Sequence, residues 1–199
     1  MEKEKALVKI HSKHEQKCTC ALRATATRAV WGCGNADADI VFIGEAPGKK
    51  EDQQGVPFVG SAGKFLGEML ASIGLARADI YITNIVKYRP PDNRDPLPEE
   101  KAACQDWLTD EIRLIDPRLI IPLGRHALTY FLPDARISEV HGQLFTQAFP
   151  KLGTRSVVSL YHPAAALYNG GLRMTLKEDF LKIPSILKTL NKRVVPEKY

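Results

Sequence analysis

The sequence predicts a three-layer α/β/α fold, in which helices cover both faces of a central four-stranded parallel sheet. Four short runs rich in Val and Ile are near-continuously apolar rather than alternating, as in strands that are buried on both faces. Helical patterns separate these runs, which is typical of parallel strands joined by crossover helices. The length fits a single domain over residues 1–199, in which residues 1–17 could form a flexible N-terminal segment.

The expected strands are the apolar runs ADIVFIGE, DIYITNIVKY, PRLIIPLG and RSVVSLYHP, at residues 38–45, 79–88, 117–124 and 155–163. In an open α/β sheet, ligands bind at the carboxyl ends of the strands. We therefore expect a functional site made by the residues at the strand ends, which are 44–48, 84–89, 124–125 and 162–163.

The expected helices cover residues 61–75, 97–115, 124–132 and 175–190. The first of them places Phe65, Leu66 and Met69 on one apolar face. The second begins with Pro98 and acidic residues, which is the usual pattern of a helix N-terminus. The last contains Pro184, and we expect this proline to interrupt it.

Composition indicates a soluble, cytoplasmic protein that contacts no membrane, and we expect it to work as a monomer. No apolar run approaches the roughly 20 residues of a membrane span, and the basic, polar start lacks the apolar core of a signal peptide. The net charge of +5 permits binding to a polyanion but does not require it. In such a protein the four cysteines are expected to be thiols or metal ligands rather than disulfides.

The stretch FIGEAPGKKED resembles a phosphate loop, but its spacing fails that test. A phosphate loop has glycines five residues apart, followed by Lys and then Ser or Thr. Gly44 and Gly48 are four apart, and Lys50 stands where the hydroxyl should be. A second stretch, GVPFVGSAGK, has the glycine spacing but places Ser61 where the lysine belongs. We therefore expect no nucleotide cofactor, and a nucleotide hydrolase is a weak alternative.

Four motifs stand in order along the chain: GEAPGKKED, GVPFVGSAGKFL, YITNIVKYRPPDNRDP and SLYHPAAAL. Together they resemble the motif series of the uracil-DNA glycosylase superfamily, and most of all its family 4, the iron–sulfur branch. The resemblance runs from about Cys18 to the last helix. It implies a monofunctional glycosylase that flips uracil out of DNA and hydrolyses its N-glycosidic bond, leaving an abasic site during base-excision repair.

The resemblance also implies which residues bind the base. Phe58 matches the stacking aromatic, although a phenylalanine is more often a core residue. Asn84 offers a donor and an acceptor that suit uracil O4 and N3–H, or it ties the backbone together. His162 could stabilise the anion at uracil O2 in a neutral or a charged form. The implied uracil-binding residues are Gly44, Ala46, Gly48, Phe58, Asn84 and His162.

The implied catalytic residues are Glu45, Asn84 and His162. Glu45 could orient or activate the attacking water or stabilise the cationic sugar, and the alternative is that it only holds its loop. Asp52 could brace that loop or be a solvated acid. The other histidines show no comparable context, and we interpret them as surface or structural residues: His11, His14, His126 and His141.

Basic residues near the strand ends could contact DNA phosphates, although each alone could be an ordinary surface charge. The turn after His162 is expected to lie against the minor groove, with Leu167 or Tyr168 near the gap left by the flipped base. The implied DNA-binding residues are Lys49, Lys87, Arg89, Arg125, Leu167 and Arg173.

The resemblance implies a 4Fe–4S cluster held by four cysteines, and this chain departs from that ligand set. Cys18 and Cys20 form a C-x-C pair where the family has C-x-x-C, and Cys104 matches the ligand on the following helix. Tyr88 stands at the third ligand position, whereas such clusters take thiolates. Cys33 could compensate only through a rearranged N-terminal loop. Retention and loss of a structural cluster both stay open, and the chemistry needs no metal. A catalytically weak module that binds damaged DNA is the alternative function.

Overall fold

The computed structural model describes residues 2–190, which contain a six-stranded mixed sheet with the strand order β1-β3-β2-β4-β6-β5. The four predicted strands form its centre and run parallel, whereas β1 and β5 pair antiparallel at the two edges. The strands are β1 Cys33–Gly34, β2 Ile40–Gly44, β3 Tyr81–Asn84, β4 Leu119–Pro122, β5 Leu144–Phe149 and β6 Gly153–Val158.

The prediction of a four-stranded parallel sheet was therefore wrong at both edges. The edge strand β1 has only two residues, too few to leave a pattern in the sequence. The other edge strand, β5, has no buried residue, so it lacks the continuous apolar run by which the central strands were recognised.

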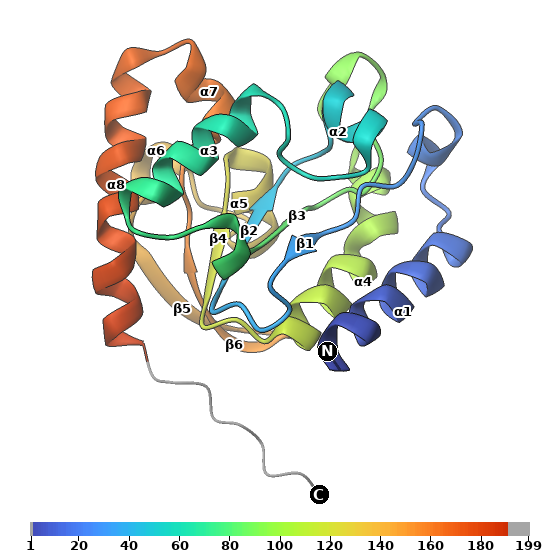
Figure 1. Ribbon diagram of the computed structural model, residues 1–199, viewed down its shortest axis with the longest axis horizontal. Helices are drawn as coiled ribbons and strands as arrows, with labels where there is room; N and C mark the ends of the chain where they lie inside the picture. The colour runs from blue at the N-terminus through green and yellow to red at the C-terminus, as the bar shows by residue number, and fades with distance from the viewer. Residues whose placement is uncertain (1, 191–199) are drawn as a thin grey trace, which may run out of the picture.

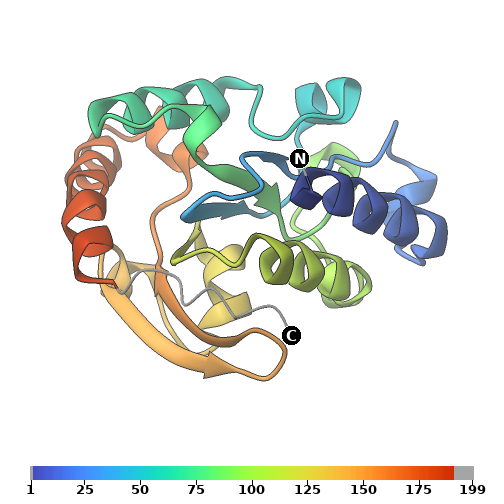
Figure 2. The ribbon, with the colours of Figure 1, turned by 60° about the horizontal axis from the view of Figure 1, so that its bottom comes forward.

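Helices cover both faces of the sheet, as predicted (Figures 1 and 2). The helices α1, α4 and α5 pack on one face, and α3, α7 and α8 pack on the other. The α-helices are α1 Glu2–Lys17, α2 Lys49–Gln54, α3 Ser61–Ser72, α4 Pro98–Ile115, α5 Arg125–Phe131, α6 Ile137–Val140, α7 Pro163–Leu167 and α8 Gly170–Thr189. Short 3-10 helices are η1 Ala21–Ala24, η2 Arg77–Asp79 and η3 Pro91–Asn93.

The central strand β2 shows how one strand serves two cores. Val41 and Ile43 belong to the core on the α4 side, whereas Ile40 and Phe42 belong to the core on the α8 side. Successive residues of a strand point to opposite faces, and helices cover both faces of this sheet. All four side chains are therefore buried. This double burial explains the continuous apolar run in the sequence.

Two helices differ from expectation. Residues 2–17, which could have been a flexible segment, form α1, where Leu7 is buried and His14 contacts Asp110 of α4 at 2.9 Å. The last helix, α8, continues through Pro184 rather than ending there. None of the helices in the described part of the chain combines the length and apolar character needed to cross a membrane.

Candidate active site at the carboxyl ends of the central strands

The segments that follow β2, β3 and β6 meet around a cavity of about 180 Å³. Its lining contains most of the residues that the sequence assigned to base binding, and Gly44 lies next to it. The lining residues are Ala46, Gly48, Glu51, Phe58, Ala62, Asn84, His162 and Ala164. The strand ends thus come together as predicted, and the contacts of these residues with a base stay predictions.

Phe58 forms one wall of the cavity in a conformation that is rare for a residue with a side chain. Its φ of 55° lies in the left-handed region, and its ring centroid is 5.7 Å from that of His162. Arg77 donates hydrogen bonds to the carbonyl oxygens of Phe58 and Gly63. A Cβ on Gly63 would lie 1.7 Å from the Phe58 oxygen, so only glycine fits there. These contacts hold the aromatic ring in place.

Glu51 is a residue of this site that the sequence analysis missed. Its Oε1 accepts hydrogen bonds from the backbone N–H groups of Val59 and Gly60, at 3.0 and 2.7 Å. The neighbouring Asp52 accepts from the backbone and hydroxyl of Thr27, at 2.9 and 2.6 Å, and is buried. Asp52 is therefore a brace rather than a solvated acid. The only feature of the sequence that could have indicated a role for Glu51 was its position in an acidic pair after the glycine loop.

Asn84 and Gly44 face each other at the ends of β3 and β2, where they are register partners. The Asn84 side chain is buried and lines the cavity. A Cβ on Gly44 would lie 2.4 Å from Asn84 Oδ1 and 2.7 Å from the ring of Phe58. A glycine is thus required for the amide and the ring to approach the same space.

His162 is the N-cap of α7, and its ring orientation follows from that role. Its Nδ1 accepts a hydrogen bond from the backbone N–H of Ala164 at 3.1 Å. The proton of the neutral ring is therefore on Nε2. Burial lowers the pKa of His162 to about 4, so the ring is neutral near pH 7. The alternative of a charged histidine, which the sequence left open, is disfavoured.

His162 also lines a second cavity, of about 440 Å³, which contains Glu45. Burial, followed by the charge of Asp95, raises the pKa of Glu45 to about 7, and Lys101 and Arg125 act against this rise. The ring of His126 also approaches this carboxylate, with Nε2 3.8 Å from Glu45 Oε1. From the sequence we interpreted His126 as a surface or structural residue. Its contact with Glu45 could not be predicted, because it joins positions that are far apart in the sequence.

With this geometry in view, comparison with known proteins identifies the family. The family model described as "Uracil DNA glycosylase superfamily" matches residues 31–184. The chain belongs to this superfamily. It is 49% identical over 170 residues to a protein named Type-4 uracil-DNA glycosylase from Archaeoglobus fulgidus, covering 82% of this chain and 84% of the relative.

Other members of the uracil DNA glycosylase superfamily match at lower sequence identity. The chain is 43% identical over 187 residues to the Type-4 uracil-DNA glycosylase of Thermotoga maritima, which covers 92% of this chain and 95% of the relative. It is 32% identical over 172 residues to the Type-5 uracil-DNA glycosylase of Thermus thermophilus, covering 78% and 77%. The type-4 resemblance drawn from the four motifs is thereby confirmed.

The cysteines of this superfamily member do not form a set of four thiols. Cys18, Cys20 and Cys104 lie together, and hydrogen bonds with Cys104 and Cys20 lower the pKa of the Cys18 thiol. Tyr88 adjoins Cys18, and burial raises the pKa of its phenol. Cys33 lies elsewhere, opposite Ile82 at the sheet edge, so among the described residues it does not complete the group. Three thiols and a neutral phenol do not fit a four-thiolate cluster.

A second group of ligand-type atoms lies beside the large cavity. Atoms of Glu45, Asp95 and His126 lie within 4.8 Å of one another. Arg125 donates to Asp95 at 2.8 Å, and Lys101 contacts His126 Nδ1 at 3.3 Å. Protein cations therefore compensate the acidic charge, and we interpret this group as an ion-pair network rather than a metal site.

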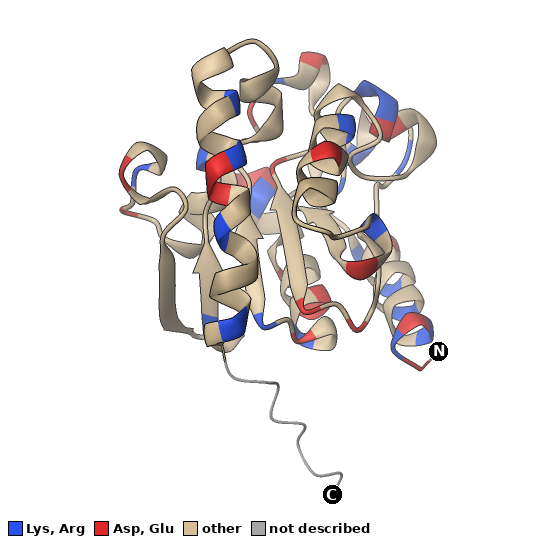
Figure 3. Ribbon diagram, turned by 60° about the vertical axis from the view of Figure 1, so that its left-hand side comes forward, with Lys and Arg blue, Asp and Glu red and all other residues tan. Residues whose placement is uncertain are grey.

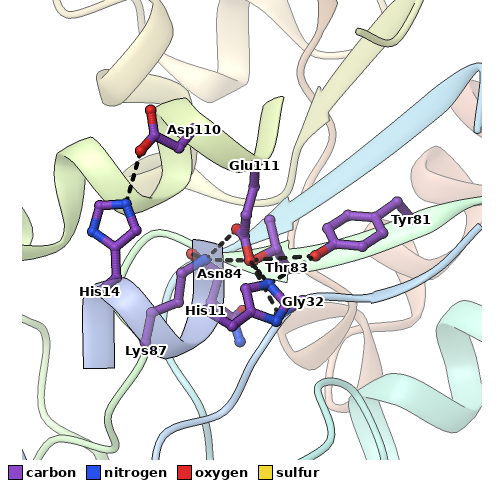
Figure 4. Close-up of polar contacts among 9 residues, drawn as sticks. All are labelled: His11, His14, Gly32, Tyr81, Thr83, Asn84, Lys87, Asp110 and Glu111. Atoms are coloured by element: carbon purple, nitrogen blue, oxygen red, sulfur yellow. Dashed lines mark hydrogen bonds and ion pairs between the residues drawn. The ribbon is translucent and has the colours of Figure 1, made fainter. Parts of the chain in front are cut away.

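The assignment of Lys87 to DNA binding was wrong. Its side chain is fully buried, and Nζ donates to Glu111 Oε2 at 2.6 Å and to the Asn84 carbonyl at 2.9 Å (Figure 4). The same glutamate contacts His11 of α1 at 3.0 Å. Because Lys87 follows an apolar run at a strand end, it was interpreted as an exposed lysine that binds phosphate. The carboxylate that neutralises it lies 24 positions away in the sequence and left no local signal.

The other predicted DNA contacts lie at the surface or close to it. Lys49 is exposed, Arg89 bonds to Asn93, and Arg173 pairs with Glu68. Basic and acidic segments are interspersed along the helices in Figure 3, which agrees with a modest net charge rather than a basic face. At the end of α7, Leu167 is partly buried against the α8-side core.

Tyr168 follows Leu167, and its side chain is 93% exposed. The exposed residue of this pair is therefore the tyrosine. Leu167 is partly buried against the α8-side core, and a contact of either residue with the gap left by a flipped base stays a prediction.

Proposed function

We propose that this protein is a monofunctional uracil-DNA glycosylase that hydrolyses the N-glycosidic bond of a deoxyuridine extruded from DNA and leaves an abasic site. The observation that carries the proposal is the convergence of Phe58, Asn84 and His162 on one small cavity at the strand ends. The relatives named Type-4 uracil-DNA glycosylase, which match over most of their own lengths, support the same activity.

Recognition of the base follows from the cavity walls. The ring of Phe58 offers an apolar face on which a flat base can stack, and stacking of this kind is worth about 1–3 kcal/mol per base. The amide of Asn84 offers a donor toward uracil O4 and an acceptor toward N3–H. Cytosine presents the reverse pattern at these positions, so the fixed amide discriminates against it.

Departure of the base needs stabilisation of negative charge. When the bond between sugar C1′ and uracil N1 breaks, its electron pair leaves with the base, and charge develops at uracil O2. The neutral ring of His162 donates from Nε2, since Nδ1 is occupied by the Ala164 N–H. A fixed donor in a site from which water is excluded is worth far more than one in solution.

Attack by water completes the reaction. The oxygen of a water molecule forms the new bond to C1′, and Glu45 accepts a proton that passes finally to the uracil anion or to solvent. Glu45 lies in the larger cavity, and His162 lines both that cavity and the base site. The attacking water and the base would therefore occupy adjacent cavities on either side of the sugar. Its raised pKa makes it a better base than an exposed glutamate.

The proposal is tested by incubating the protein with a uracil-containing oligonucleotide and then treating the product with alkali. Strand cleavage only after alkali supports a monofunctional glycosylase, and the Glu45→Gln and His162→Asn variants should be strongly impaired. Binding without excision would favour the alternative of a module that recognises damaged DNA. Nucleotide hydrolysis in place of excision would contradict both.

We also propose that the chemistry proceeds without an iron–sulfur cluster, because the set of three thiols and a phenol lacks the fourth thiolate. Here Cys18, Cys20, Cys104 and Tyr88 would hold the N-terminal turn against α4 by packing alone. Iron analysis and a visible spectrum of anaerobically purified protein test this. Stoichiometric iron with a cluster absorbance would contradict it, whereas colourless and active protein would support it.

We further propose that the protein works on DNA as a monomer in the cytoplasm. Uracil-containing DNA is the partner that the family membership supports. Sedimentation of the free protein and of its complex with a short uracil-containing duplex tests the stoichiometry. A dimer in either state would contradict the monomer.

A further inference from the structure

Asp95 and His126 have no part in the mechanism above, although both lie beside the acid that would activate water. Asp95 follows η3, and His126 is the second residue of α5. Together with Glu45 they line the same 440 Å³ cavity, which reaches His162. Their place next to the reacting groups raises the question of what they do there.

The contacts of His126 define its protonation and its partner. Nε2 lies 3.0 Å from Asp95 Oδ2, and Nδ1 lies 3.3 Å from the ammonium group of Lys101. A lysine can only donate, so Nδ1 must accept and the ring proton must be on Nε2, facing Asp95. The Nε–H of Arg125 also points at Nε2, at 3.0 Å, which suits the opposite tautomer. In that tautomer Asp95 would keep Arg125 as its donor, but Lys101 would lose its acceptor on His126.

Asp95 is thus held from two sides, by His126 and by the guanidinium of Arg125 at 2.8 Å. Oxygen atoms of the Asp95 and Glu45 carboxylates lie within 4.8 Å of each other. The negative charge of Asp95 therefore adds to the effect of burial and raises the proton affinity of Glu45, in the manner of two acids that share a site. The other charged or titratable groups around Glu45 are Lys101 from α4, Arg125 and His126 from α5, His162 at the start of α7, and Arg94, which is paired with Glu100.

We propose that Asp95 and His126 are positioning residues that make Glu45 a stronger base toward the attacking water. Asp95 acts through its charge, and His126 acts by holding Asp95 in place. This inference rests on the proposed glycosylase function and adds to it the residues that tune its base. The proton balance is unchanged: water gives its proton to Glu45, and neither Asp95 nor His126 takes it.

The test is the pH profile of single-turnover uracil excision from one oligonucleotide. If Glu45 must be ionised, the rate rises with pH as this carboxyl loses its proton, and the Glu45→Gln variant should lose that rise. Removing the like charge with Asp95→Asn lowers the proton affinity of Glu45. The rise should then move to lower pH, by roughly half a unit at low salt, and by less at high salt because Asp95 is 58% exposed.

The role of His126 is tested by His126→Ala and by the double variant. Since this histidine acts through Asp95, His126→Ala should also move the rise of the excision rate to lower pH, but by less than Asp95→Asn does. In the double variant the rise should lie at the same pH as in Asp95→Asn alone. Asp106→Asn is the matched control, because Asp106 is an exposed acid paired with Lys151 away from the site. Its profile should equal that of the unmodified protein.

The outcomes separate the two proposals. Absence of uracil excision by the unmodified protein would overturn the glycosylase function itself. Normal excision with an unshifted rise in Asp95→Asn, or a rise that survives in Glu45→Gln, would overturn the positioning role while leaving the function intact. A loss of rate in Asp95→Asn without any shift would likewise show that Asp95 only supports the fold.

Discussion

At the residue scale, the fold fixes the conformation or the position of the proton in the groups that form the site. Gly44 is the clearest case, because its missing side chain is the space into which both Asn84 and Phe58 extend. His162 is another, because the cap that it provides to α7 determines which ring nitrogen carries the proton. In both cases a local backbone role and a chemical role are carried by the same residue.

Gly44→Ala should reduce uracil excision by about 100-fold, because displacing reacting groups by about 1 Å has costs of that order. The added Cβ would push Asn84 and Phe58 apart, since both approach to well under 3 Å. Single-turnover kinetics measure the loss. Gly67→Ala in α3 is the control, because a Cβ there meets nothing within 4 Å. Equal activity of the two variants would contradict the tight fit.

The pKa of His162 predicts a pH dependence of folding stability. Because the folded pKa is lowered from 6.5 to about 4, the unfolded chain binds more protons within that window. The free energy of unfolding should therefore fall as pH decreases from 6.5 to about 4. His162→Asn keeps a capping side chain but removes the titration, so its urea denaturation should depend less on pH in this window. Identical pH dependence would contradict the buried neutral ring.

At the element scale, the buried pair of Lys87 and Glu111 joins β3 to α4, and His11 joins α1 to the same carboxylate (Figure 4). Lys87 also binds the carbonyl of Asn84. The strand end that presents the Asn84 amide to the cavity is thus tied to two helices on one face of the sheet.

Lys87→Met should lower the free energy of unfolding by about 3–5 kcal/mol, because it removes the lysine cation that neutralises the fully buried Glu111 carboxylate. Combining it with Glu111→Leu should cost less than the sum of the two single changes. Lys151→Met, which breaks an exposed pair with Asp106, should change stability by less than about 1 kcal/mol. Urea denaturation compares the four variants, and a mild effect of Lys87→Met would show that the pair is not desolvated.

The elements also show what the sequence could predict. The four central strands were recognisable because burial on both faces leaves a continuous apolar run. The strand-end motifs also indicated Asn84 and His162, which line the same cavity. The edge strand β5 is exposed and left no such signal. Glu51, His126 and the partner of Lys87 were missed because their contacts depend on how distant segments meet, which no local pattern records.

At the scale of the whole molecule, the net charge of +5 is modest, and basic and acidic segments are interspersed along the helices in the view of Figure 3. Association with DNA should therefore weaken as salt increases, with a slope set by a few phosphate contacts. Shape and base recognition must then provide much of the selectivity, because the electrostatic attraction does not depend on sequence.

Lys49→Gln should weaken DNA binding equally for uracil-containing and ordinary DNA and reduce the salt slope by about one. Lys49 is exposed at the start of α2, beside the glycine loop. Lys151→Gln, on the hairpin between β5 and β6, is the control and should leave the slope unchanged. Fluorescence anisotropy over a series of salt concentrations measures both. An unchanged slope for Lys49→Gln would remove this lysine from the DNA interface.

The left-handed backbone of Phe58 has a consequence for the order of events during turnover. Arg77, Glu51 and the absent side chain of Gly63 hold the loop before any DNA arrives. The loss of conformational entropy that shapes the base site therefore occurs during folding and not when the substrate binds. The released base therefore leaves behind a receptor that keeps its form, and free uracil should compete with the next strand for it.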